Sequence, residues 1–286
     1  MKICTEADQV IKKGVERAVG GAYPCLFSQL FIFARKKIVR MYNNHVFSRE
    51  FHICGYDVDH NCNISISKLL SMMHETAWSH VSYLKRGWQE LYEQGLFWAL
   101  AKLHLKIFKL PKWNDKIRVD TWAKERESIM FLRDYEVFNE SGELLCCAIS
   151  EWMLVDYRLN KIVRLEKLNT TLDYPKDRMA FEGRVPRLQR LEYPENPKFH
   201  SVLLSDLDMN QHVNNASYVR WVVDQLQYDF YNQHQIEEVV INYSNQLKPD
   251  EKYCIVLQET TSQNFNATLY SEDKKEVCKV LLVVKK

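Results

Sequence analysis

Asp208, Asn210 and His212 alternate along one short polar stretch of this sequence, Asp206-Leu-Asp-Met-Asn-Gln-His-Val-Asn-Asn215. In an extended segment, alternate side chains leave the backbone on the same face, so these three are expected to lie together. An apolar pattern of helical period follows directly, which places them beside a helix N-terminus with its partial positive charge. A carboxylate base, an amide donor and a titratable ring in that position predict polar carbonyl chemistry.

An altered copy of this motif lies 149 residues earlier in the chain, where Asp59, Asn61 and Asn63 repeat the spacing with Asn in place of the His. Asp and Asn are common before helices because they cap them, and capping accounts for the first copy. In the second copy Asn214 and Asn215 already supply caps, so the alternating set is left for catalysis.

Other site classes fit the motif poorly. An EF-hand calcium loop needs Gly at its sixth position and Glu at its twelfth. The two copies have Cys62 and Lys68, or Gln211 and Ser217, at those places. Zinc would need further ligands at the right spacing, which are missing, and neither a G-x-S-x-G elbow nor a Gly-rich phosphate loop occurs. We therefore expect no metal and no cofactor.

The elements around each copy resemble each other. Apolar residues recur at helical spacing from Ile66 to Leu84 and from Val219 to Phe230, with Ser65 or Ser67 and Asn214 as expected N-caps. Alternating segments predict strands at 116–123, 131–138, 144–155, 253–259, 266–270 and 277–284. Turns are expected at 139–142 and 272–275. The prediction is an α+β tandem repeat, in which each helix lies on an antiparallel sheet and the two sheets pair edge to edge.

Composition agrees with an ordinary globular chain. Of 286 residues, 46% are hydrophobic, and the net charge of +2 does not indicate nucleic-acid binding. The eight cysteines form no C-x-x-C pair, and no signal sequence or membrane span is apparent, so a reducing cytoplasmic setting is expected. Residues 1–44 are expected to be a poorly ordered extension, with Met41 as an alternative start.

The second motif, followed by Tyr218 and Trp221, closely resembles the signature of acyl-acyl-carrier-protein (acyl-ACP) thioesterases, a bacterial type related to the plant enzymes. The segments 51–84 and 152–155 are similar as well. The resemblance implies a double hotdog fold, in which a long helix in each repeat is wrapped by an antiparallel sheet. Residues 45–166 would form the N-terminal repeat, 167–198 a linker and 199–286 the catalytic C-terminal repeat.

Carried over residue by residue, Asp208, Asn210 and His212 match the catalytic set of the family. Asp224 stands where the family usually has a Glu. A Glu-Cys pair of the plant enzymes falls at Gln246 and Leu247, so a cysteine nucleophile at that position is excluded here. Asp208 would then activate water or, as a second choice, attack directly. The amide of Asn210 would bind the thioester carbonyl, the imidazole of His212 would share a proton and hold the carboxylate, and Gln246 would add a hydrogen bond.

The resemblance also implies an apolar tunnel for the acyl chain, shaped by the first repeat. Met72, Met73, Trp78 and Trp98 are its expected lining, although ordinary core packing explains each of them equally well. The expected partner is acyl carrier protein bearing a phosphopantetheine-linked acyl chain. Because that partner is acidic, a basic surface should receive it, and four linker arginines are suggested: Arg178, Arg184, Arg187 and Arg190.

Three other functions stay open at this point. The same scaffold could serve an acyl-CoA thioesterase or a dehydratase, although a dehydratase pair would bridge the repeats and the first repeat has Asn63 there. A non-catalytic acyl-binding protein is the third, supported by the missing Glu-Cys pair. Since the chain contains a pair of repeats, either a monomer or a homodimer would suffice.

Overall fold

The computed structural model describes residues 39–42, 45–124, 129–159, 161–164, 174–260 and 264–285. The chain divides into two compact units, Met1–Arg40 and Met41–Lys286. Strand β1 (Val39–Tyr42) spans the boundary between them, and every other described element belongs to the second unit. Apart from this strand, the expected N-terminal extension lies outside the described residues.

The second unit is built on one antiparallel sheet to which two similar sets of strands contribute. The first set is β2 (Val46–His52), β3 (Leu96–Ile107), β4 (Lys116–Ala123), β5 (Phe131–Asn139) and β6 (Leu144–Asp156), with the short β7 (Lys161–Val163) paired to β6. The second set is β8 (Phe199–Ser201), β9 (Gln235–Tyr243), β10 (Lys252–Thr260), β11 (Asn264–Ser271) and β12 (Glu276–Lys285). All six strands predicted from the sequence are present, which confirms those predictions.

The strand order shows that the two sets are related by symmetry. The order runs β2-β4-β5-β6-β3 and then β9-β12-β11-β10-β8. Read from its outer edge to the junction, each set therefore has the same order of connections along the chain. The sets meet where β3 pairs antiparallel with β9, from Lys102 opposite Asn242 to Lys106 opposite Glu238. The expected edge-to-edge pairing is therefore confirmed, and neither edge is left open at the junction.

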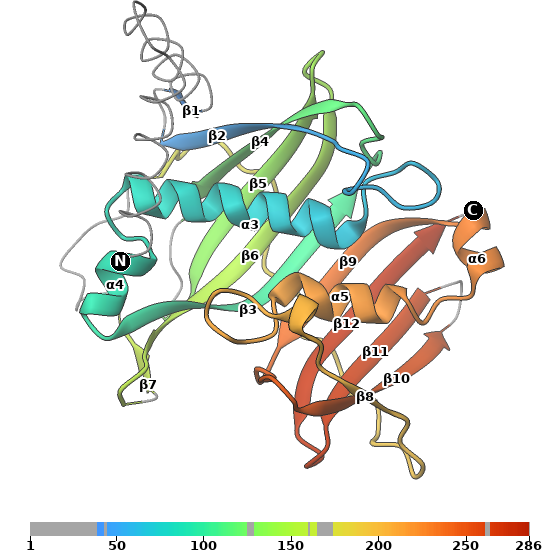
Figure 1. Ribbon diagram of the computed structural model, residues 1–286. Helices are drawn as coiled ribbons and strands as arrows, with labels where there is room; N and C mark the ends of the chain where they lie inside the picture. The colour runs from blue at the N-terminus through green and yellow to red at the C-terminus, as the bar shows by residue number, and fades with distance from the viewer. Residues whose placement is uncertain are drawn as a thin grey trace, which may run out of the picture. The chain divides into compact units, whose positions relative to one another are not determined.

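Four helices follow the same duplicated plan. Helix α3 (Ile66–Tyr83) lies across the first set of strands and α5 (Asn215–Val223) across the second (Figure 1). Each is followed by a one-turn-and-a-half helix, α4 (Trp88–Glu93) or α6 (Tyr228–Gln233), and a 3-10 turn η2 (Leu204–Asp206) precedes α5. We refer to β2–β7 with α3 and α4 as the first repeat, and to β8–β12 with α5 and α6 as the second.

Local sequence explains where the main helices begin. The side chain of Ser65 caps α3 by accepting a hydrogen bond from the Lys68 N–H, and Asn214 caps α5 through the Ala216 N–H at 2.9 Å. Both predicted caps are confirmed. Along α3, Leu69, Leu70, Met73 and Ala77 face the sheet and are buried in the principal core. Burial of this apolar stripe fixes the rotation of the helix.

The two main helices differ in length, which the sequence pattern did not predict. Helix α5 has nine residues and α3 has eighteen. After Val223 the backbone tightens into i→i+3 hydrogen bonds, from the Leu226 N–H to the Val223 carbonyl at 3.0 Å, and Gln227 is extended. Phe230, which was expected to continue the same helix, lies on α6 and packs edge-on against Phe265. The second repeat therefore has a short main helix and an early α6.

Residues 174–198 cross the face of the sheet that is opposite to the helices. They contain no helix or strand and are held by buried polar side chains of the sheet. Asp134 and Glu151 of the first repeat accept the N–H groups of Ala180 and Val185, and Asn242 and Thr268 of the second accept those of Leu188 and Leu191. Each of these four side chains alternates with neighbours that face the helices, which places them on the far face.

Two of the linker arginines are tied into this layer. Arg178 pairs with Asp120 and Glu136, and Arg184 makes a bidentate ion pair with the buried Glu151. These contacts hold the linker to the sheet, so the two side chains are poorly placed to receive a partner. Arg187 and Arg190 are exposed.

Asp134 makes the stability of this layer dependent on pH. Burial raises the pKa of its carboxyl from 3.8 to about 6, although Lys124 at 3.3 Å opposes the rise, and its Oδ1 has no hydrogen-bond partner among the described residues. The native state therefore keeps this proton to a higher pH than the unfolded chain. The free energy of unfolding should fall as the pH rises from about 4 to about 6, by up to about 3 kcal/mol from this group.

The variant Asp134→Asn should lose that component of the pH dependence, because its amide stays neutral and still accepts the Ala180 N–H. Urea unfolding at pH 4.5 and 7.5 measures it: the parent should lose more stability between the two values than the variant. An equal loss in both proteins would show that Asp134 titrates normally in the folded state.

Candidate active site

The motif from Asp208 to His212 forms a tight turn between two bridging residues, Leu207 and Val213. The Asp208 N–H donates to the carbonyl of His212 at 2.8 Å, and Gln211 has a φ of +61°. The segment is therefore not extended, because the backbone hydrogen bonds close the chain on itself. Proximity of the three side chains comes from the turn and not from strand alternation.

The carboxylate of Asp208 organises this turn. Its Oδ1 accepts the backbone N–H groups of Asn210 at 2.8 Å and of His212 at 3.4 Å, and its Oδ2 accepts the amide of Asn210 at 3.3 Å. Such hydrogen bonds fix the direction of the carboxylate. Asp208 thus has a structural duty as well, contrary to the expectation that the second copy is free of one.

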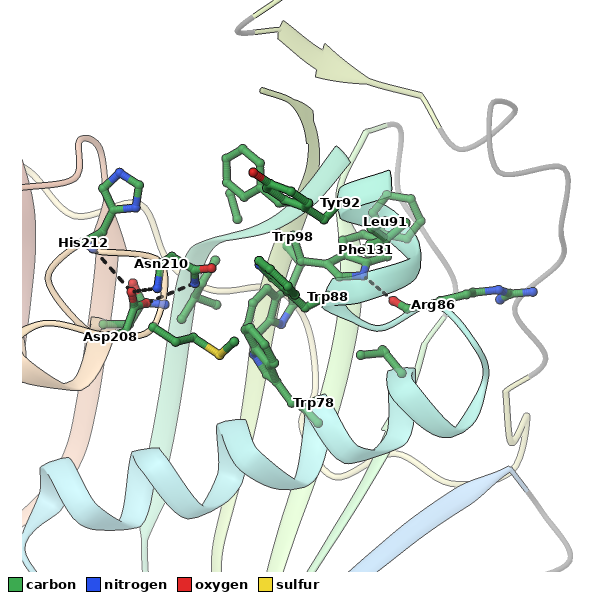
Figure 2. Close-up of a pocket in the computed structure, with 18 of the residues that line it drawn as sticks. Trp78, Arg86, Trp88, Leu91, Tyr92, Trp98, Phe131, Asp208, Asn210 and His212 are labelled. Atoms are coloured by element: carbon green, nitrogen blue, oxygen red, sulfur yellow. Dashed lines mark hydrogen bonds between the residues drawn. The ribbon is translucent and has the colours of Figure 1, made fainter. Parts of the chain in front are cut away.

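His212 contributes to this arrangement through its backbone. Its imidazole makes no hydrogen bond within the described part of the chain, and Figure 2 shows the ring turned away from the Asp208 carboxylate. The expectation that the imidazole holds the carboxylate is therefore wrong, since the backbone N–H does so. The ring stays free to meet a substrate.

The first copy of the motif has the same turn. Asp59 Oδ1 accepts the N–H groups of Asn61 at 2.9 Å and of Asn63 at 3.1 Å, and Cys62 has a φ of +59°. Capping and turn formation are therefore common to both copies. The two sites differ in the space beside them.

A cavity of about 480 Å³ opens beside the second copy and runs along α3. Asp208, Asn210, His212 and Gln246 line one end of it. The rest is largely aromatic and apolar, with side chains from α3, α4 and the strands of the first repeat: Ala77, Trp78, Trp88, Leu91, Tyr92, Phe97, Trp98, Leu100, Phe131, Trp152 and Tyr157 (Figure 2). A polar end and an apolar body suit a long apolar ligand with one reactive polar group.

The structure brings most of the predicted site residues to this cavity. Trp78 and Trp98 line it. Gln246 reaches it because the Val213 N–H donates to the Leu247 carbonyl at 3.0 Å, which aligns that segment with the motif. Leu247 itself is a buried core residue, where the plant signature would have cysteine.

Three predicted residues lie elsewhere. Met73 is fully buried in the principal core and Met72 packs against that core, and neither lines the cavity. Asp224 is the C-cap of α5, at the opposite end of that helix from the motif. Burial raises the pKa of Asp224, and nearby Arg220 opposes the rise. Met72 and Met73 therefore occupy core positions, which is the alternative to tunnel lining that the sequence had left open.

A smaller cavity of about 330 Å³ adjoins the motif on the other side of Trp78 and Trp152, which line both spaces. Ser71, His74 and Glu75 of α3 line it, opposite Asp208 and Asn210. Burial lowers the pKa of His74 to about 4, so its ring is neutral at ordinary pH, and its Nε2 has no hydrogen-bond partner among the described residues. No sequence motif singles out His74, although Ser71, His74 and Trp78 share a face at helical spacing.

Arg133 is a second lining residue that the sequence did not indicate. Its side chain is buried and donates to Thr121 Oγ1 and to His80 Nδ1, both at 3.1 Å. Burial and then this cation lower the pKa of His80 to about 3, which keeps the ring neutral as an acceptor. Strand alternation could have placed Arg133 on the helix-facing side, but not in the cavity.

Other reactive groups are distant from both cavities. The six cysteines within the described ranges are free, and none of them lines either space. Those ranges also hold no cluster of three or more His, Cys, Asp or Glu placed to bind a metal ion. No helix in the described part of the chain is long and apolar enough to cross a membrane.

Comparison with family models divides the chain much as the structure does. Residues 44–169 match the acyl-ACP thioesterase N-terminal domain, and residues 190–283 match the acyl-ACP thioesterase C-terminal domain. The two matches together cover most of the chain.

Similar proteins are known from plants. The chain is 27% identical over 237 residues to oleoyl-acyl carrier protein thioesterase 2 of Arabidopsis thaliana, which covers 77% of this chain and 64% of the relative. It is 28% identical over 230 residues to a palmitoyl-acyl carrier protein thioesterase of Gossypium hirsutum, covering 76% and 55%. The chain thus spans about three fifths of the length of these curated relatives.

Solved structures share the fold. An acyl-ACP thioesterase from Bacteroides thetaiotaomicron superposes with a TM-score of 0.78 at 19% identity, covering 84% of this chain and 98% of that one. The 12:0-ACP thioesterase from Umbellularia californica superposes with a TM-score of 0.72 at 20% identity, covering 86% and 99%. The architecture is that of the double hotdog, as the sequence resemblance implied.

Proposed function

This chain belongs to the acyl-ACP thioesterase family, and we propose that it hydrolyses fatty acyl-ACP thioesters to free fatty acid and ACP. The observation that carries the proposal is the Asp208 turn at one end of a cavity whose body is largely aromatic and apolar. A fatty acyl chain matches the apolar body, and its thioester would then lie against the turn.

Asp208 is the base in this proposal. Its carboxylate would take a proton from a water molecule whose oxygen attacks the thioester carbonyl carbon. The two backbone N–H groups that bind Oδ1 leave Oδ2 with only the Asn210 amide, at 3.3 Å, so this oxygen is the one placed to accept the proton. Direct attack by the carboxylate is the second choice, because it would have to leave those hydrogen bonds.

The neighbouring groups would stabilise the charge that develops. The Asn210 amide and the N-terminus of α5 are donors for the oxyanion of the tetrahedral intermediate. When the carbon–sulfur bond breaks, the leaving thiolate takes a proton from the imidazole of His212, which lines the cavity without a partner in the described residues, and the proton that Asp208 took from the water would replace it. Gln246 would add a hydrogen bond to the bound substrate, and Asp224 would act only through the position of α5.

The two repeats would divide the work. The second supplies the turn that carries the chemistry, and the first supplies α3, α4 and the strands that enclose the acyl chain. Because both parts are in one chain, a monomer is sufficient. Free cysteines throughout the described ranges support a reducing cytoplasmic location.

ACP is the proposed carrier, and acyl-CoA is the alternative. We expect kcat/KM for a given acyl chain to be at least tenfold higher on the acyl-ACP than on the matched acyl-CoA. Thiol release by the purified protein, with both substrates at equal chain length, measures this ratio. A ratio below one would favour the acyl-CoA enzyme.

The same assay addresses the non-catalytic alternative. Release of no thiol from either substrate at any chain length, together with measurable binding of acyl-ACP, would replace hydrolysis with an acyl-binding role. Free fatty acids secreted by a bacterial host that expresses the protein provide an independent readout.

A further inference from the structure

We propose that three stacked aromatic side chains at the far end of the cavity, Trp88 and Tyr92 of α4 and Tyr157 after β6, set the maximum length of the acyl chain. We call them the aromatic ladder. The inference rests on the proposed hydrolysis of acyl thioesters and deepens it, because it assigns the residues that choose among substrates.

The ladder is a continuous stack. The rings of Trp88 and Tyr92 are 4.8 Å apart at 19°, and those of Tyr92 and Tyr157 are 5.1 Å apart at 21°. The Tyr157 hydroxyl donates to the Tyr92 carbonyl at 3.1 Å, and Arg158 lies over the Tyr157 ring. Trp98 Nε1 donates to the carbonyl of Arg86 at 3.4 Å, which ties the α3–α4 connection to the sheet. These contacts hold the three rings in place as one wall.

The wall lies opposite the reactive end of the cavity. Figure 2 shows Asp208, Asn210 and His212 on one side and the α4 residues Trp88, Leu91 and Tyr92 on the other. Trp98 and Phe131 lie beside these α4 residues. An acyl chain whose carbonyl lies at Asp208 therefore extends along α3 toward the ladder. Its terminal methyl group would meet these rings.

In the second repeat the equivalent short helix, α6, lies directly beside a motif. There α6 follows a main helix that is nine residues shorter, a difference of about 13 Å along the helix axis. Its side chains contact the first motif directly: Tyr231 donates to Asp59 Oδ2 at 2.8 Å, and Asn232 Oδ1 is 2.7 Å from His60 Nε2. Tyr228 stacks on His60 at 4.9 Å.

This contrast indicates that the distance between a motif and the short helix that faces it, α4 or α6, determines how long an acyl chain can fit between them. In one repeat the short helix occupies the place beside the motif, and in the other it closes a cavity that begins there. The ladder is also a surface element, since Trp88 is 37% exposed and Tyr92 is 49% exposed. Truncation of these rings should therefore extend the cavity without disturbing the principal core.

The test compares parent and variants on acyl-ACPs that differ by two carbons. Trp88→Ala, Tyr92→Ala and the double variant should raise kcat/KM for the first chain that the parent rejects by roughly tenfold relative to the parent's preferred chain. Full burial of two more methylenes, at about fourfold each, would give about sixteenfold, and part of this is lost because the new space is half open to solvent. The matched control is Tyr228→Ala on α6, an exposed aromatic of the second repeat, which should leave the preference unchanged.

An unchanged chain-length preference in Tyr92→Ala and Trp88→Ala, with melting curves like that of the parent, would overturn the inference. If Trp88→Ala fails to fold, Tyr92→Ala alone decides, because about half of its side chain is exposed. Failure of the proposed function looks different, since the parent itself would then release no thiol from any substrate.

Discussion

Replacing Asp208 with asparagine is expected to lower kcat/KM for acyl-ACP hydrolysis by about 10³-fold while the protein stays folded. Asparagine keeps a side-chain oxygen that can accept the backbone N–H groups of Asn210 and His212, so the turn is preserved. What is lost is the negative charge and the ability to take a proton from water. Thiol release measures the activity, and circular dichroism with a melting curve measures the fold.

Asp59→Asn is the matched control, because Asp59 occupies the same turn in the first repeat. It should retain activity within about threefold of the parent. Equal losses of activity in the two variants would show that activity depends on the turn and not on the Asp208 carboxylate. Full activity in Asp208→Asn would remove Asp208 from the mechanism.

The largest expected effect on stability comes from Asp206, two residues before Asp208. Its side chain is 1% exposed and binds Arg220, the Trp221 indole N–H at 3.2 Å and the Leu203 N–H at 2.7 Å. Asp206→Ala removes the acceptor of the buried Trp221 indole N–H and the ion-pair partner of the part-exposed Arg220. We expect the free energy of unfolding to fall by about 3 kcal/mol, with a drop of roughly 5–10 °C in Tm.

Asp57→Ala supplies the comparison for that stability effect, since Asp57 precedes the first motif as Asp206 precedes the second. Asp57 accepts the Cys54 N–H at 2.9 Å and lies 3.6 Å from the half-exposed Lys68 amine, so its loss should cost about 1 kcal/mol. Urea denaturation of both variants gives the two values. If Asp57→Ala proves as destabilising as Asp206→Ala, the burial of the Arg220 and Trp221 contacts is not the cause.

The sequence predicted the three strands that lie between the edge and the centre of the sheet in each repeat, β4–β6 and β10–β12, and missed both the central strands and the edge strands β2 and β8. The predicted strands have clear alternation and turn residues at their ends. The two central strands, β3 and β9, were missed because both of their faces are covered, by the helices on one side and the linker on the other. In β3, Leu103, His104 and Leu105 are all buried, so the polar–apolar alternation that reveals a strand is absent.

The candidate site shows the same division between local and long-range information. Asp208, Asn210 and His212 were predictable because one motif contains them, and Trp78 and Trp98 were predictable as lining from the resemblance. The turn geometry was missed, because spacing alone does not separate a strand from a closed turn. His74 and Arg133 were missed since each lines a cavity that residues distant in the sequence enclose together, which no local pattern records.

The unequal lengths of α3 and α5 have a kinetic consequence. A symmetric pair of repeats would hold two equivalent reaction centres, and occupancy of one could alter the other across the shared β3–β9 junction. Under the proposed function, α6 seated on the first motif leaves each polypeptide with one reaction centre, and it would accept one acyl chain at a time. Saturation by substrate is then hyperbolic for a single chain, and a Hill coefficient above one would have to arise from contacts between separate molecules.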